Sequence, residues 1–179
     1  MRARQTLPRL WLLSDARNDA ALERALRRLP RGSGLVFRHY HLPPGERRAR
    51  FAVLARLARA RGHWVILAAS AADAARWGAD GAYGAPAELG RESARLRIAT
   101  AHSLGELAIA RRAGADAVFL SPVFATRSHP GAARLGPVRF RLLAARVTVP
   151  VIALGGMTAR SAKRLAWHRW GAIDGLAQR

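Results

Sequence analysis

Cysteine is absent from the sequence, and Lys163 is the only lysine among its 31 basic residues. Without cysteine, the chain has no disulfide framework and no thiolate that could serve as a metal ligand or a nucleophile. No stretch of eighteen or more apolar residues occurs either, so we expect no membrane span. The short apolar run near the start meets Ser14 and Asp15 at once, which does not fit a targeting segment. We therefore expect a cytoplasmic protein.

Acidic residues are also scarce: there are 11, which leaves a formal net charge of +20. A charge of this size normally indicates that the protein binds nucleic acid or an anionic membrane. Here the arginines are scattered along expected helices from Arg24 to Arg169, without an RNA-binding signature or a zinc-finger spacing. We interpret them as a solvated arginine-rich surface and expect neither a membrane nor nucleic acid as a functional partner.

The pattern of apolar runs indicates one domain over residues 1–179. Half of the 179 residues are apolar, which is enough for a single substantial core. Short continuous apolar runs alternate with helical patterns, as in a parallel sheet covered by helices. We expect strands at 9–13, 34–38, 64–67, a brief one ending at 83, 96–99, 117–120, 149–154 and 170–173.

Eight such units favour a closed (β/α)8 TIM barrel over an open sheet. Gly-Ala-Asp recurs at 78–80 and 114–116, in each case before a strand, which indicates repeated helix-to-strand units. Because the chain ends at Arg179, we expect a barrel that is truncated or lacks its final helix. Apolar sheet surface would then be exposed unless the N-terminal segment or a second copy of the chain, in a homo-oligomer, covered it.

Polar segments follow several of the expected strands. The longest is the loop 121–136, SPVFATRSHPGAARLG, which comes directly after the apolar run 117–120. In a TIM barrel the loops after the strands meet on one face and build the site there. We therefore interpret the loop as the mouth of an anion-binding pocket. The other segments expected on this face are 38–41, 100–103, 155–158 and 174–175.

Three segments, taken in order, resemble the thiamine phosphate synthase and TenI family. They read IATAHSLGELAIARRAGADAVFL, LSPVFATRSHPG and PVIALGGMTARSAKRL, and the resemblance extends from Leu10 onward. It implies a (β/α)8 barrel that joins hydroxymethylpyrimidine diphosphate to a thiazole phosphate and releases pyrophosphate with the help of Mg²⁺. It also implies that the partners are these small phosphorylated pyrimidine and thiazole substrates.

On the pyrimidine side the resemblance is uneven. Of the family's glutamine, arginine and lysine after the second strand, only Arg38 remains, and we expect it to bind pyrophosphate. An asparagine-aspartate pair that binds pyrimidine and metal is replaced by Ala68 and Ala69, which supply no ligand oxygen. The second metal carboxylate of the family falls on Glu88. A magnesium ion would then be held by Glu88 together with substrate phosphates.

The later half of the chain matches the family more closely. Thr126 and Ser128 take the places of two substrate-binding hydroxyl residues, although turn-stabilising hydroxyls would look the same. His129 stands where a lysine reaches the pyrophosphate, so the resemblance makes Arg38 and His129 the catalytic cations. With an unperturbed pKa near 6.5, a histidine is mostly neutral at pH 7 unless an anion raises that pKa.

The remaining candidates concern the thiazole phosphate. Gly155 and Gly156 match the glycine pair that closes on this phosphate, or they form a plain strand-to-helix turn. Asp174 replaces a serine of the same cradle, and a carboxylate beside a phosphate is repulsive unless a cation bridges them. His102 either contacts substrate or forms a hydrogen bond to Thr100 or Ser103.

Two alternatives to the transferase remain open. A family member with these replacements could bind thiazole phosphate without turnover. A TenI-like thiazole tautomerase needs an acid-base group near the thiazole, and the histidine of that branch falls on Pro122. His102 or His129 would have to take its place.

Overall fold

Eight parallel strands close into a barrel in which each strand pairs with the next and β8 pairs with β1. The structure is a computed structural model that describes residues 7–90, 96–128, 131 and 133–177. All eight expected strands are present, with bounds that differ by a residue or two. They are β1 (Leu10–Leu13), β2 (Gly34–Phe37), β3 (Trp64–Leu67), β4 (Gly81–Gly84), β5 (Leu96–Ala101), β6 (Ala117–Leu120), β7 (Val151–Ala153) and β8 (Trp170–Ala172).

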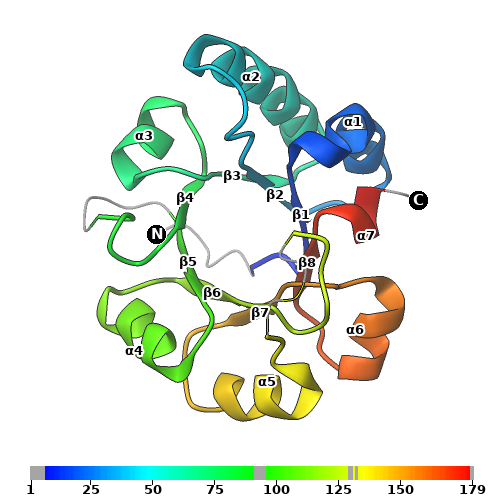
Figure 1. Ribbon diagram of the computed structural model, residues 1–179. Coiled ribbons are helices and arrows are strands. Elements are labelled where there is room, and N and C mark those ends of the chain that lie inside the picture. The colour runs from blue at the N-terminus through cyan, green and yellow to red at the C-terminus, as the bar shows by residue number, and fades with distance from the viewer. Residues whose placement is uncertain (1–6, 91–95, 129–130, 132, 178–179) are drawn as a thin grey trace.

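Helices surround this ring of strands, as Figure 1 shows in a view along the barrel. Several of them begin with a side-chain cap; for example, Ser103 caps α4 and Thr158 forms a capping box at α6. None of the helices in the described part of the chain is long and apolar enough to cross a membrane. Their bounds are η1 (Ala16–Asn18), α1 (Asp19–Arg28), α2 (Pro44–Ala60), α3 (Ala71–Arg76), α4 (Leu104–Arg112), α5 (Gly136–Ala144), α6 (Ala159–Leu165) and α7 (Asp174–Ala177).

Side chains that alternate along the strands fill the interior of the barrel. Trp11 and Phe119 are fully buried there, with ring centroids 5.9 Å apart in an edge-to-face arrangement. Gly34 makes room for the indole, because a β-carbon at that position would run into the ring of Trp11. The interior is therefore a packed core rather than a pore, and a ligand site must lie at one end of the barrel.

The Gly-Ala-Asp segments have the same structural role in both repeats. Asp80 Oδ2 accepts a hydrogen bond from the backbone N–H of Val65 over 2.9 Å, and Asp116 Oδ2 accepts one from Arg97 over 2.7 Å. Each aspartate precedes one strand and ties it to the start of the strand before. The predicted repeat of helix-to-strand units is confirmed.

The final helix is short, as the sequence indicates, and α7 spans only Asp174–Ala177. The apolar sheet surface at this position is covered, so the exposure that the sequence analysis expected for an uncovered barrel does not occur. Leu12 is 0% exposed, Trp170 is 7% exposed and Ala172 is 4% exposed. The reason is that α7 lies beside α1, so the two helices share the cover of β8 and β1 (Figure 1).

Candidate functional site

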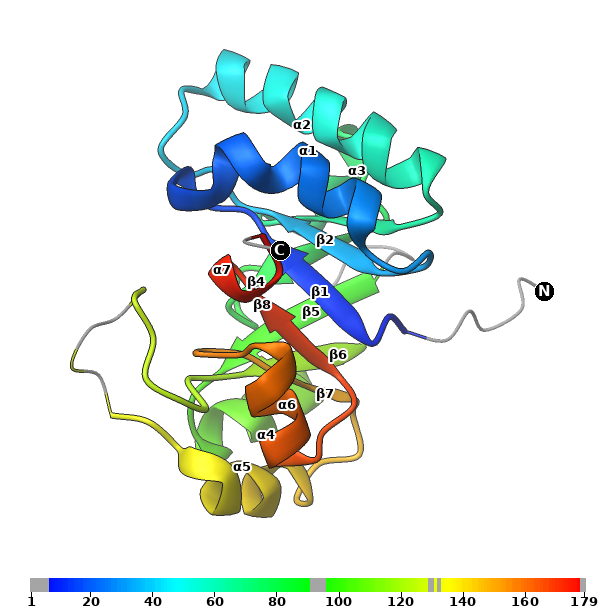
Figure 2. The same cartoon turned by 90° about the vertical axis from the view of Figure 1, so that its right-hand side faces the viewer.

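A cavity of about 670 Å³ opens at the carboxyl ends of the strands. The loop after β6 projects from this end of the barrel, as the side view shows (Figure 2). The fold therefore brings segments that are far apart in the sequence to one rim, as the sequence analysis expected. His129 lies outside the described residues. The other predicted site residues all line the cavity: Arg38, Glu88, His102, Thr126, Ser128, Gly155 and Gly156.

The backbone beside Arg38 is fixed by a buried chain of polar groups. The Arg38 N–H donates to Ser14 Oγ over 2.8 Å, and Ser14 Oγ lies 2.7 Å from Nδ1 of the fully buried His39. His39 Nε2 lies 2.8 Å from Asp19 Oδ1. Because a carboxylate only accepts, Nε2 carries the proton and Ser14 donates to Nδ1. Burial lowers the pKa of His39, and its hydrogen bond to Asp19 offsets this only in part.

The Arg38 guanidinium is only partly paired. Its Nη2 lies 3.4 Å from Asp15 Oδ2, and its buried Nε has no hydrogen-bond partner within the described residues. A buried donor without a partner costs free energy, but this atom is inaccessible, so an anion would contact Arg38 through the part of the residue that lines the cavity. This leaves Arg38 prepared to bind an anion in the cavity.

Arg17 is a second cation at the rim, and sequence reasoning missed it. It lies on η1 directly after β1, and its Nη2 donates to Ser128 Oγ over 3.0 Å. Its Nε lies 3.6 Å from Asp174 Oδ1 and 3.7 Å from Asp15 Oδ1. The guanidinium thus joins the loop after β6 to the start of α7. The available signal was its place four residues after the end of β1, where barrel site residues are found.

Arg17 also changes the interpretation of Asp174. A lone carboxylate here would repel a phosphate, whereas a carboxylate that faces a guanidinium at 3.6 Å is largely compensated. The pair therefore makes this side of the rim less negative than Asp174 alone would. A bound phosphate would then gain the attraction of Arg17 without the full repulsion of Asp174.

The hydroxyl groups of the loop after β6 face the cavity and also organise the loop. The Ser128 N–H donates to Thr126 Oγ1 over 3.3 Å, and Ser128 Oγ accepts from Arg17. Both hydroxyls therefore stabilise a turn, as one of the two interpretations expected. Because they also line the cavity, their role toward a ligand stays a prediction.

Gly155 and Gly156 bring the loop after β7 against the loop after β6. Their φ angles are +91° and +63°, a region that favours glycine. A β-carbon at Gly155 would lie 2.7 Å from the Cα of Pro122, and one at Gly156 would run into the Ala125 carbonyl oxygen. Neither glycine N–H donates a hydrogen bond within the described residues, so both remain available to an anion.

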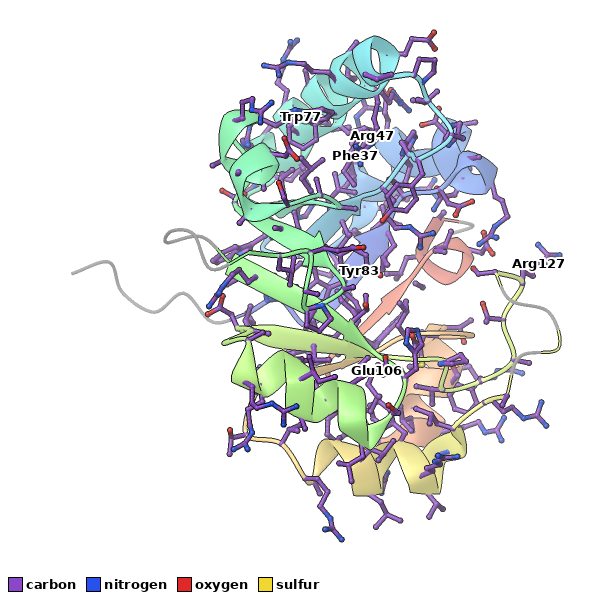
Figure 3. All side chains as sticks on the ribbon, turned by 60° about the vertical axis from the view of Figure 1, so that its left-hand side comes forward. Phe37, Arg47, Trp77, Tyr83, Glu106 and Arg127 are labelled. Carbon is purple, nitrogen blue, oxygen red and sulfur yellow. The ribbon has the colours of Figure 1, made fainter. Side chains whose placement is uncertain are left out.

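The rim beside β2 and β3 is built differently. Arg47 on α2 occupies it, donating from Nε to the Arg38 carbonyl oxygen and from Nη2 to the Ala68 carbonyl oxygen, each over 2.9 Å. Its guanidinium also lies between aromatic rings, 5.8 Å from the centroid of Phe37 and 5.5 Å from that of Trp77 (Figure 3). A fixed positive charge therefore lies against the backbone carbonyl of Ala68, next to the two alanines at which the resemblance places metal-binding side chains.

These residues do not fit a magnesium ion held by the protein. Ala68 and Ala69 supply no side-chain oxygen, and the carbonyl of Ala68 already accepts from Arg47. Glu88 is a single exposed carboxylate on the cavity rim. Among the described residues there is no group of three histidines, aspartates or glutamates that could hold a metal ion. We therefore assign no chemical step to a metal in this cavity.

Tyr83 and Thr100 line the inner part of the cavity, and Figure 3 shows Tyr83 inside the ring of strands. Burial raises the pKa of Tyr83 to about 12, so its hydroxyl stays protonated and can donate. The ring packs edge to face on Phe119, with centroids 5.5 Å apart. The sequence placed Tyr83 only in a strand, because nothing local marks the inward side of a four-residue segment.

His102 lines the cavity but has a different partner from the two that we expected. Its Nδ1 and its backbone N–H both lie 2.9 Å from Glu106 Oε2, and neither Thr100 nor Ser103 is bonded to its ring. Burial would raise the pKa of Glu106, but these hydrogen bonds outweigh it and hold that pKa below its usual value. Pro122 also lines the cavity, and it brings no titratable group.

Curated relatives match only parts of this chain. A segment of 59 residues is 44% identical to the "Putative thiamine-phosphate synthase 2" of Aquifex aeolicus, covering 33% of this chain and 32% of that protein. A segment of 84 residues is 37% identical to the "Thiamine-phosphate synthase" of Chloroflexus aurantiacus, covering 46% of this chain and 38% of that protein. The matched segments thus span about a third of these relatives.

Solved structures resemble the fold over nearly all of its length. The thiamine phosphate pyrophosphorylase of Pyrococcus furiosus superposes with a TM-score of 0.76 at 23% identity, over 94% of this chain and 86% of that one. FabK of Thermotoga maritima reaches 0.72 at 17% identity, over 95% of this chain and 59% of that one. At such identities these likenesses show the barrel and leave the activity open.

The family model described as "Thiamine monophosphate synthase" matches residues 10–176. This match runs through every element that lines the cavity, from β1 to α7. The chain belongs to the thiamine monophosphate synthase family.

Proposed function

We propose that the protein joins hydroxymethylpyrimidine diphosphate to a thiazole phosphate in the cavity at the carboxyl ends of the strands, with release of pyrophosphate. The observation that carries this proposal is the convergence of Arg17, Arg38, Ser128 and the Gly155–Gly156 loop on one cavity. A volume of about 670 Å³ is within the range of sites that enclose small organic ligands.

The thiazole phosphate is assigned to the half of the rim formed by β1, β6, β7 and β8. There, the free N–H groups of Gly155 and Gly156 and the guanidinium of Arg17 can donate to phosphate oxygens. The hydroxyl of Thr126 borders the same half. Donors fixed by the backbone and by a salt-bridged arginine need little reorganisation when the anion enters.

The diphosphate is assigned to the side of Arg38. When the bond between the pyrimidine methylene carbon and its diphosphate oxygen breaks, the oxygen takes both electrons, and the leaving group needs nearby positive charge. Arg38 lines the cavity and can supply this charge, and His129 remains the second predicted cation. The neutral hydroxyl of Tyr83 can donate to either substrate.

A coupled assay tests this proposal directly. The folded protein is incubated with both substrates, with and without Mg²⁺, and thiamine phosphate and pyrophosphate are measured. We expect product with the unchanged protein and at least a tenfold loss with Arg38→Gln, because a hydrogen bond to a charged group contributes about 1.5–3 kcal/mol. Arg139→Gln removes an exposed arginine on α5 and is the control. No product above background from folded protein would contradict the transferase.

A second candidate function is binding of thiazole phosphate without turnover. It is favoured by one specific observation: alanines stand at 68 and 69, where the resemblance expects metal and pyrimidine ligands, and Arg47 holds the carbonyl oxygen of Ala68. In that case the half of the rim around Arg17 would still be a complete anion site.

Calorimetry separates the two candidates. Thiazole phosphate that binds with about one molecule per chain, together with an absence of product in the coupled assay, supports the binding protein. Binding accompanied by product supports the transferase, and the absence of binding contradicts both.

A further inference from the structure

A second cavity lies at the opposite end of the barrel, at the amino ends of β8, β1, β2 and β3. Its volume is about 930 Å³. Arg9 precedes β1, Arg31 lies in the turn before β2, and Arg169 precedes β8; all three line it. Trp64, the first residue of β3, also lines it. None of these residues belongs to the site at the carboxyl ends of the strands.

The charge of this second cavity is uncompensated. No aspartate or glutamate lines it within the described part of the chain. Across residues 7–90 and 133–177, no ion pair or side-chain hydrogen bond neutralises the guanidinium groups of Arg9, Arg31 and Arg169. By contrast, the rim around Arg17 pairs its cations with Asp15 and Asp174.

Buried unpaired donors support the same conclusion. Arg169 Nε and the Nε of the neighbouring Arg61 are buried without a hydrogen-bond partner among the described residues. Burial first, and then the positive charges of Arg169 and Arg9, lower the pKa of His168. Burial and then the charges of Arg61 and Arg31 lower the pKa of His63, against a hydrogen bond to the Leu26 carbonyl. The positive charge is therefore concentrated at the amino ends of β8, β1, β2 and β3, whereas Asp80 and Asp116 lie at the amino ends of β4 and β6.

Arg9 and Arg31 are exposed, so water screens their charges, and the main cost lies at the buried Nε of Arg169, which has no partner among the described residues. Like charges without partners destabilise the folded state, and an unpaired buried N–H loses the hydrogen bond that water would give it. In TIM barrels the amino-terminal face usually contributes to stability, so a concave cluster of arginines there is unexpected on stability grounds alone. A multivalent phosphate would supply the missing acceptors to several guanidinium groups at once.

We propose that the cavity formed by Arg9, Arg31, Arg169 and Trp64 binds an oligophosphate anion, either a free polyphosphate or the triphosphate of a nucleotide. The three arginines supply the phosphate contacts. In the nucleotide case the base stacks on the indole of Trp64. This site is separate from the reaction proposed above, so it can exist whether or not that reaction occurs.

Titration of tripolyphosphate in low-salt, magnesium-free buffer tests the proposal by calorimetry. We expect two binding events, one at each end of the barrel. Arg31→Gln and Arg169→Gln each weaken one event about tenfold, since a charged hydrogen bond contributes roughly one to two factors of ten. Arg38→Gln weakens only the other event. The control Arg139→Gln, which lowers the net charge equally from α5, changes neither beyond a small electrostatic effect.

Thermal melting without added anion excludes a merely structural role. Removing an uncompensated charge leaves the midpoint of Arg31→Gln and Arg169→Gln equal to or above that of the unchanged protein. Two results would overturn the site. The first is a single binding event that Arg38→Gln removes. The second is that the titrations of Arg31→Gln and Arg169→Gln equal that of Arg139→Gln. ATP distinguishes the sources: tighter binding than tripolyphosphate, lost in Trp64→Leu, assigns a nucleotide, and equal binding assigns a polyphosphate.

Discussion

The two halves of the rim at the carboxyl ends of the strands differ in how they treat charge. Around β1, β6, β7 and β8, Arg17 bridges Ser128, Asp15 and Asp174, and glycine N–H groups remain free. Around β2 and β3, the guanidinium of Arg47 donates to backbone carbonyls and packs against aromatic rings. Ala68 and Ala69 stand there, at positions where the resemblance expects side chains that carry oxygen. The first half keeps its donors available to a ligand. In the second half, the cation Arg47 instead holds the backbone after β2 and β3 in place.

The largest effect that this comparison predicts is at Arg17. Arg17→Gln should weaken thiazole phosphate binding by about 10- to 100-fold, because it removes a charged donor and leaves Asp174 to repel the phosphate. Calorimetry measures the change. The double variant Arg17→Gln/Asp174→Ser should recover part of the loss, since the repulsive carboxylate is gone. Equal affinities for the single and double variants would contradict the compensation between Arg17 and Asp174.

A second prediction concerns the contact between the loops after β6 and β7, in the half of the rim around Arg17. Gly155→Ala should lower the free energy of unfolding by about 1–3 kcal/mol, because its φ of +91° disfavours a side chain and a β-carbon would press on Pro122. Urea denaturation measures this loss. Gly131→Ala has a similar φ of +78° but open space around it, so it separates backbone strain from the contact. Equal losses in the two variants would leave no role for the approach to Pro122.

A smaller effect of pH on stability is expected from the hydrogen bonds that join Ser14, His39 and Asp19 beside Arg38. The pKa of His39 is lowered in the folded protein, so between that value and about 6.5 the unfolded chain binds more protons. The free energy of unfolding should therefore fall as pH drops below about 6.5. Asp19, whose pKa is also lowered despite partial burial, adds a further loss at more acidic pH.

Thermal melting between pH 7.5 and 5 measures the effect of pH. His39→Asn removes the titrating ring and keeps a residue type that tolerates the φ of +40° found here. Its dependence on pH should be flatter than that of the unchanged protein. Parallel curves would show that His39 does not carry the effect.

The smallest predicted effect comes from adding a metal-binding carboxylate to the half of the rim beside β2 and β3. Ala69→Asp restores a carboxylate at the position where the resemblance expects a metal ligand, and it should make Mg²⁺ tighten diphosphate binding by about three- to fivefold, or roughly 1 kcal/mol or less. In the unchanged protein we expect little effect of Mg²⁺ on this binding. Calorimetry with diphosphate, with and without Mg²⁺, measures both. A strong dependence on Mg²⁺ in the unchanged protein would contradict the conclusion that these residues do not fit a held metal ion.

The elements of the fold could be predicted because their signals are local. Apolar runs marked the strands, and the repeated Gly-Ala-Asp marked two strand starts whose aspartates do accept backbone hydrogen bonds from the preceding strand. The short final helix was also expected. Its cover was not, because that depends on α1 lying beside α7, which are separated by almost the whole chain.

Site residues also divide into those that local sequence signals predict and those whose role depends on distant partners. Arg38 was found because it lies at the end of an expected strand and matches a family position. Arg17 was missed because its role depends on Ser128, 111 residues further along the chain, and on Asp174. Arg47 looked like one more helix arginine, and only the packing of α2 carries it to the carbonyl of Ala68.

The sequence by itself determined which segments form strands and helices, and that eight such units close into a barrel, because backbone preferences and apolar periodicity act over a few residues. Tertiary structure alone decided which cations stay available to a ligand. Charge compensation and hydrogen bonding depend on distances of a few ångströms between groups from different strands. Only closure of the barrel sets those distances.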